Sequence, residues 1–122
     1  MLFSRRALKT DSYRRRAISR PYSRLTAIRE LLEADEVCAD IVRYFVDHTE
    51  AADTARGIAE WWIGRDVSQT AEALTRLQTH AVVRSYFVQE AASVYAFTKN
   101  PILRDTLRQY VRLLPASSSV RR

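Results

Sequence analysis

The chain has 122 residues, of which 47% are hydrophobic and 28% are charged, and this composition indicates one folded domain rather than a disordered segment. No apolar run reaches the roughly 18 residues that a transmembrane helix needs. The single cysteine, Cys38, excludes an internal disulfide framework and favours a reducing, cytoplasmic location.

The net charge of +6 is concentrated in a basic N-terminal arm, residues 1–24. The arm carries eight basic side chains and one acid, a net of +7, whereas the remaining 98 residues carry a net of −1. This asymmetry predicts attraction to a polyanion, with nucleic acid ahead of a membrane surface, and the alternative is a solvated tail. The arm residues expected to contact DNA are Arg5, Arg6, Arg14, Arg15, Arg16 and Arg20.

After the arm, apolar residues recur at helical spacing over 25–32 and again over 37–46. Pro21 and Ser23 mark the start of the first helix. Asp35 either caps a second helix or lies inside one continuous helix, and the pattern allows both.

The next segment predicts two short helices joined by a tight turn. Asp53 or Thr54 caps the first helix, and Gly64 ends it. Asp66, two residues later, caps the second helix. Its inward stripe is predicted to be Thr70, Ala73, Leu74 and Leu77. This arrangement is typical of a helix-turn-helix motif.

Two runs rich in β-branched and aromatic residues follow, over 82–88 and 94–98, and the five residues 89–93 connect them. They predict a β-hairpin, and a hairpin directly after a helix-turn-helix is a winged helix, here over 36–99. Asn100 and Pro101 then begin a last helix.

The expected fold is therefore mostly α with a small β-hairpin, a winged helix-turn-helix with flanking helices. Three segments are expected along the chain. They are the basic arm over 1–24, the winged-helix domain with its flanking helices over 25–114, and a flexible tail over 115–122.

Some of these residues also resemble those of bacterial winged helix-turn-helix transcriptional regulators of the ArsR and MarR types. The resemblance rests on Gly64-Arg65-Asp66 and on the later residues Ala73, Leu74, Leu77 and Ala81-Val82-Val83-Arg84. It implies a regulator that binds double-stranded DNA as a homodimer paired through its N- and C-terminal helices. The chain departs from the pattern at Ala81, where the family has glycine, and by one extra residue between Ala59 and Gly64.

In a DNA-binding winged helix, the second helix of the turn motif enters the major groove. Its predicted exposed residues are Val67, Ser68, Gln69, Ala71, Glu72, Thr75, Arg76 and Thr79. The expected contacts outside the arm are Arg65, Ser68, Gln69, Arg76 and Arg84, with Gln69 suited to adenine and Arg76 to a phosphate or guanine. Glu72 in this helix and Glu90 in the wing oppose DNA because they repel phosphates.

Other candidate sites are weaker. Trp62 is predicted to face the core and Trp61 a partner, and Cys38 is expected to be a buried structural thiol. His48 and His80 lack metal-ligand spacing. The chain has no glycine-rich phosphate loop, nucleophile elbow or carboxylate pair, so we expect no enzyme, cofactor or metal.

Two alternatives to DNA binding remain open. In the first alternative, the winged helix is a non-enzymatic protein-interaction module, and the basic arm docks on an acidic protein partner. A membrane-surface role ranks third, because the apolar residues of the arm do not form a stripe, and we expect no membrane association.

Overall fold

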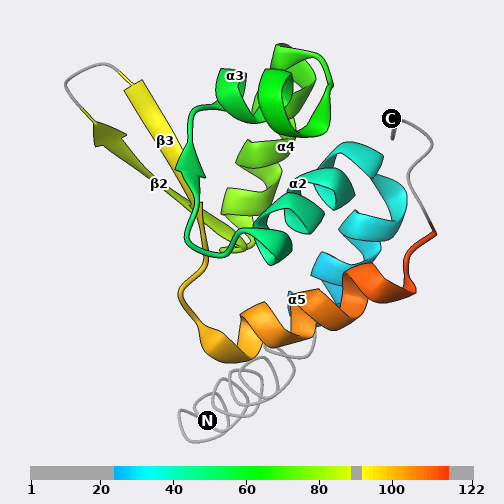
Figure 1. The fold of residues 1–122 in the computed structure, drawn as a ribbon. Helices are drawn as coiled ribbons and strands as arrows, with labels where there is room; N and C mark the ends of the chain where they lie inside the picture. The colour runs from blue at the N-terminus through cyan, green and yellow to red at the C-terminus, as the bar shows by residue number, and fades with distance from the viewer. Residues whose placement is uncertain (1–23, 89–91, 116–122) are drawn as a thin grey trace, which may run out of the picture. The chain divides into compact units, whose positions relative to one another are not determined.

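A computed structural model describes residues 24–88 and 92–115. In this part of the chain the fold is mostly helical, with a small three-stranded antiparallel sheet (Figure 1). The chain divides after Glu30 into two compact units. Residues 24–30 of the first unit are helical, and the second unit begins at Leu31.

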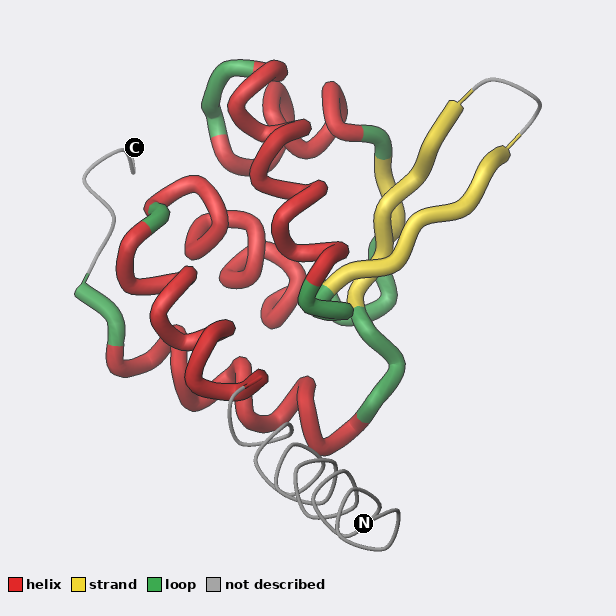
Figure 2. Tube along the Cα trace, turned by 180° about the vertical axis from the view of Figure 1, so that it is seen from behind, coloured by secondary structure: helices red, strands yellow, loops and turns green. Residues whose placement is uncertain are grey.

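The second unit contains both helices and strands. Its elements are α2 (Glu36–Asp47), β1 (Ala52–Asp53), α3 (Ala55–Gly57), the π-helix η1 (Ile58–Ile63), α4 (Val67–Thr79), β2 (Val83–Val88), β3 (Ala92–Phe97) and α5 (Pro101–Leu113). The hairpin of β2 and β3 projects from the helices, as the two opposite views in Figures 1 and 2 show. α5 returns to pack against α2 (Figure 1).

Asp35 separates α2 from the helical residues before it. Its backbone is extended, and its side chain accepts hydrogen bonds from the backbone N–H groups of Val37 at 3.0 Å and Cys38 at 3.2 Å. These bonds satisfy two of the N–H groups that the first turn of a helix leaves without partners. Of the two predicted possibilities, the structure therefore has the capped second helix.

The other predicted caps are also present. Thr54, rather than Asp53, caps α3 by accepting a bond from the Gly57 N–H at 3.0 Å. Asp66 caps α4, and Asn100 caps α5 ahead of Pro101. Local capping chemistry thus sets where three of the helices begin.

The helix predicted before Gly64 differs from the expected α-helix. Three α-helical residues are followed by the π-helix η1, which ends at Gly64 with a φ of 63°. A π-helical turn holds one residue more than an α-helical turn, so it accommodates the extra residue between Ala59 and Gly64. The left-handed conformation of Gly64 then ends the helix, as predicted.

Both tryptophans of η1 face outward. The prediction that Trp62 belongs to the core is wrong, because 50% of this residue is exposed, while Trp61 is 80% exposed. The Trp62 ring lies beside Tyr44 and His48, with centroids 5.0 Å and 5.1 Å away. The π-helical geometry shifts the inward-facing positions, and the buried residues of η1 are its first two.

The predicted hairpin is confirmed by the pairing of β2 with β3. Their register runs from Val83 opposite Phe97 to Val88 opposite Ala92. The sheet has a third strand, β1, which pairs with the other side of β3 and gives the order β1-β3-β2. The sequence pattern did not predict β1, since two residues are too few to show an alternation.

Ala81 occupies the turn between α4 and the hairpin in a strained conformation. Its φ is 61°, in the left-handed region that favours glycine. The next residue, Val82, donates its N–H to the Leu77 carbonyl at 2.9 Å and so closes the end of α4. This geometry explains why a glycine is expected at this position.

The core lies between α2, α4 and the sheet. Phe45 of α2 stacks on Phe97 of β3, with ring centroids 5.8 Å apart and an angle of 9° between the planes. The predicted inward stripe of α4 is confirmed, because all four residues are buried: Thr70, Ala73, Leu74 and Leu77. The inner face of α4 thus packs against α2 and the start of the hairpin, and its other face is exposed.

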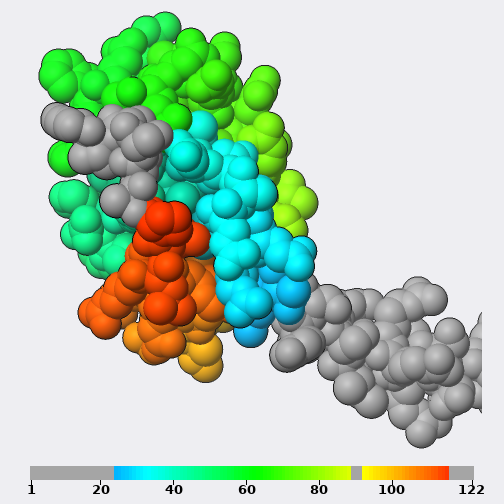
Figure 3. Space-filling view, turned by 90° about the vertical axis from the view of Figure 1, so that its right-hand side faces the viewer, coloured from blue at the N-terminus to red at the C-terminus, as the bar shows by residue number. Residues whose placement is uncertain are grey.

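α5 buries one side and exposes the other. Leu103 and Leu107, one turn apart, are buried, whereas Ile102 and Leu113 are 77% and 83% exposed. Figure 3 shows the last turns of α5, in orange and red, at the surface. α5 therefore has apolar side chains that the described residues leave uncovered.

Candidate nucleic-acid interface

The outward face of α4 consists mainly of uncharged polar residues. Val67 and Ala71 are half-buried, and the remaining members of the predicted exposed set are exposed. Ser68 and Gln69 lie in the first turn of α4, where the cap Asp66 accepts a bond from the Gln69 N–H at 3.0 Å. The exposed residues are Ser68, Gln69, Glu72, Thr75, Arg76, Gln78 and Thr79.

The threonine hydroxyls of this face are oriented by the helix itself. Thr75 donates to the Ala71 carbonyl at 3.1 Å, and Thr79 donates to the Thr75 carbonyl at 3.0 Å. A hydroxyl oxygen that donates its proton still offers lone pairs. These two side chains therefore present acceptors on the exposed side of α4.

α4 is joined to the hairpin through a side-chain hydrogen bond that the sequence did not predict. Gln78 donates its amide Nε2 to Ser85 Oγ of β2 at 2.8 Å. Gln78 follows Thr75 by three positions, so helical spacing is the signal that places it on the exposed side. The bond holds the base of the hairpin beside the outward face of α4.

Arg76, a predicted DNA contact, is bound to two acids of the protein. Its guanidinium lies 2.8 Å from Asp35 and 3.8 Å from Glu72, and 48% of the side chain is exposed. The positive charge of Arg76 is therefore largely balanced inside the folded chain.

Arg65, another predicted contact, lies in the turn and points toward α2. Its Nε donates to Asp40 at 2.7 Å and its Nη2 to Glu36 at 3.3 Å, and only 15% of the side chain is exposed. Burial alone would lower the pKa of Arg65, but the hydrogen bonds and charges of Asp40 and Glu36 more than compensate and raise it. Arg65 thus positions the turn against α2, and a DNA phosphate would have to compete with both carboxylates.

Arg84 lies at the start of the hairpin. Its Nε donates to the Phe97 carbonyl at 3.2 Å, and its guanidinium lies 5.7 Å from the centre of the Tyr86 ring. The hydrogen bond uses one donor and leaves the two terminal amino groups of the guanidinium for another contact. Arg84 is exposed, so of the predicted arginines in the described residues its charge is the most accessible.

The outer part of β2 is apolar rather than basic. Tyr86, Phe87 and Val88 are 42%, 74% and 40% exposed. Glu90 lies outside the described residues. In the described part of the hairpin, aromatic side chains are exposed toward the end of β2, and the cationic side chain of Arg84 lies near its start.

The second unit does not supply an attractive field for DNA. Over 31–88 and 92–115 the chain has nine basic and eleven acidic residues, a net of −2. The predicted arm contacts lie outside the described residues, and they are Arg5, Arg6, Arg14, Arg15, Arg16 and Arg20.

The remaining candidates are Cys38 and the two histidines. Cys38 is buried and donates to the Ala73 carbonyl at 3.7 Å, and burial and the nearby Asp35 raise its pKa to about 12. Such a thiol does not ionise at neutral pH, so the expected structural role fits. His48 Nδ1 lies 3.0 Å from the Tyr44 carbonyl oxygen, which accepts a hydrogen bond when this nitrogen carries the proton. The described residues contain no group of three or more side chains that could hold a metal.

Within residues 24–88 and 92–115, the helices are too short or too polar to span a bilayer. No protein-family model matches the chain, and searches of curated proteins and of solved structures found no similar protein.

Proposed function

We propose that the chain is a winged-helix protein that binds double-stranded DNA, with α4 in the major groove. One observation carries the proposal: the outward face of α4 is exposed, rich in uncharged hydrogen-bonding side chains and tied to the hairpin through Gln78 and Ser85. The order of α4 after a tight turn and before a hairpin supports the winged-helix assignment. The resemblance to ArsR- and MarR-type regulators is in keeping with it.

In this proposal the first turn of α4 contacts base edges. Gln69 pairs with the N6 and N7 atoms of adenine, and Ser68 serves as a donor or acceptor beside it. Arg84 contacts the phosphate backbone from the base of the hairpin. Arg65 holds the turn in place rather than touching DNA, and Arg76 reaches DNA only if Asp35 releases it.

Affinity comes chiefly from the basic arm, because the second unit is slightly acidic. A second copy pairs through the terminal helices, where Ile102 and Leu113 are exposed eleven positions apart, about three turns, and so on the same side of α5. The two-fold dimer would present two α4 helices to successive turns of the groove. We infer a non-enzymatic transcriptional regulator that acts in the cytoplasm.

Fluorescence anisotropy of labelled duplex DNA at increasing salt tests the proposal. If six or more arm residues contact phosphates, the affinity of the full chain falls about 10³-fold between roughly 50 and 200 mM salt. Deletion of residues 1–24 should weaken binding and flatten this dependence. Absence of binding by the full chain at low salt would overturn the proposal.

Protein binding is the second candidate, and the exposed aromatic residues favour it. Trp61 and Phe87 are 80% and 74% exposed, and such residues are common at the centres of protein interfaces. Trp61→Ala and Phe87→Ala should leave DNA affinity unchanged if these side chains serve a protein partner. A loss of DNA affinity in either variant would place the aromatic side chains in the DNA interface instead.

A further inference from the structure

An open hollow of about 410 Å³ lies between α2 and α5. α2 contributes Arg43, Val46 and Asp47, and α5 contributes Arg108, Val111 and Arg112. None of these residues belongs to α4 or to the hairpin, so the hollow is separate from the proposed DNA contact. Its volume lies in the range of small-molecule sites.

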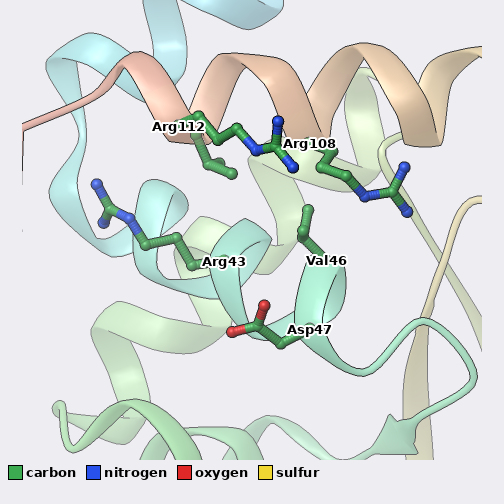
Figure 4. A pocket seen from close by; sticks show the side chains of 6 residues that line it. Arg43, Val46, Asp47, Arg108 and Arg112 are labelled. Atoms are coloured by element: carbon green, nitrogen blue, oxygen red, sulfur yellow. The ribbon is translucent and has the colours of Figure 1, made fainter.

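Side chains of opposite charge line this hollow. In Figure 4, Arg108 and Arg112 extend from α5, Asp47 lies on the α2 side, and Val46 lies between them. Among the described residues, the side chains of Asp47 and Arg112 have no hydrogen-bond or ion-pair partner. The hollow therefore holds a carboxylate and a guanidinium that do not neutralise each other.

The other two arginines differ in how firmly they are held. Arg43 donates to Asp40 at 3.1 Å and to the Pro115 carbonyl at 2.8 Å, so it forms part of the wall. Within residues 24–88 and 92–115, the Arg108 side chain has only an exposed contact of 3.3 Å with Asp105. Arg108 and Arg112, one turn apart on α5, are thus the cations available to a ligand.

The position of Asp47 does not stabilise α2. A carboxylate in the last turn of a helix is opposed by the partial negative charge of the helix end. α2 has no basic residue in that turn to offset this effect. A ligand cation beside Asp47 would give this carboxylate the partner that the described residues do not provide.

We propose that the hollow binds a small zwitterion, an α-amino acid with an apolar side chain. Its carboxylate would bind Arg108 and Arg112, its ammonium group Asp47, and its side chain would lie against Val46 and Val111. A simple anion would leave Asp47 without a partner, and a simple cation would be repelled by the two arginines. The proposal does not rest on DNA binding, because its test measures the ligand directly.

Titration of the ¹⁵N-labelled full chain with L-leucine, followed by NMR, tests the site. We expect saturable shifts of the amides of Val46, Asp47, Val111 and Arg112. Leucinamide, which lacks the carboxylate, and 4-methylpentanoate, which lacks the ammonium group, should each bind about tenfold more weakly.

Variants assign the binding to these side chains. Asp47→Asn and Arg112→Gln should each weaken leucine binding about tenfold. Arg56→Gln is the control, since Arg56 is an exposed arginine of α3 paired with Glu60 outside the hollow. The proposal would be overturned if no shifts appeared at about 10 mM leucine, a concentration that nearly saturates a site with a Kd of about 1 mM. Equal binding of 4-methylpentanoate and leucine would also overturn it. So would unchanged leucine binding in both site variants, or an equal loss of leucine binding in the control variant.

Discussion

Polar side chains differ in environment between the turn before α4 and the exposed face of α4. At the turn, Arg65 is nearly buried and its guanidinium is shared between Asp40 and Glu36. On the exposed face, Ser68 and Gln69 point outward without a charge to balance. The charge of an arginine in this region is therefore available to a ligand only where the folded protein leaves it accessible.

The largest expected effect is a loss of folding stability when the ion pairs of the turn before α4 are removed. Arg65→Ala should lower the free energy of unfolding by about 3 kcal/mol, because it leaves the buried carboxylate of Asp40 without its closest partner. Urea denaturation measures this change. Arg56→Ala, which removes an exposed ion pair, is the control and should cost at most about 0.5 kcal/mol. A loss below about 1 kcal/mol for Arg65→Ala, together with a large loss of DNA affinity, would assign Arg65 to the interface.

Two backbone substitutions should give effects of opposite sign on either side of α4. Gly64→Ala should destabilise the protein by about 1 kcal/mol, since φ is 63° and no atom within 4 Å would obstruct the added Cβ. Ala81→Gly should stabilise it by about 0.5–1 kcal/mol, because glycine relieves the φ of 61° but loses more chain entropy. Thermal unfolding of both variants measures the pair. Equal signs would show that packing, rather than backbone conformation, governs these turns.

A smaller effect is expected at the end of α2. Asp47→Asn should raise the free energy of unfolding by about 0.5 kcal/mol, because it removes a negative charge from a helix C-terminus. Asp105→Asn is the matched control. It removes an exposed ion pair with Arg108 and should lower stability by a few tenths of a kcal/mol, about 0.3. If Asp47→Asn instead lowered the free energy of unfolding, the Asp47 carboxylate would make a stabilising contact in solution, which would contradict this prediction.

Features that depend on neighbouring residues were predictable from the sequence. The caps at Asp35, Asp66 and Asn100 and the terminating Gly64 each act within a few positions of the chain. The inward stripe of α4 follows from helical periodicity in the same way. The exception is Trp62, because the π-helix changes the periodicity on which its predicted burial rested.

Features that depend on distant residues were not predictable. Arg65 and Asp40 are 25 positions apart, and periodicity cannot show that the turn packs against α2. The hollow between α2 and α5 likewise joins residues from opposite ends of the second unit. The exposed face of α4 was predictable from the sequence, whereas the ion pairs of Arg65 and Arg76 with acids of distant segments required the tertiary structure.

Selection of bound sequences from a randomised duplex library tests the central claim, that α4 reads DNA, most directly. The full chain and its Gln69→Ala variant should enrich different sequences, with the change confined to one or two positions where adenine is preferred. Gln109→Ala, an exposed glutamine on α5, should enrich the same sequences as the unaltered chain. An unchanged preference in Gln69→Ala, or no enrichment by the full chain, would contradict the account.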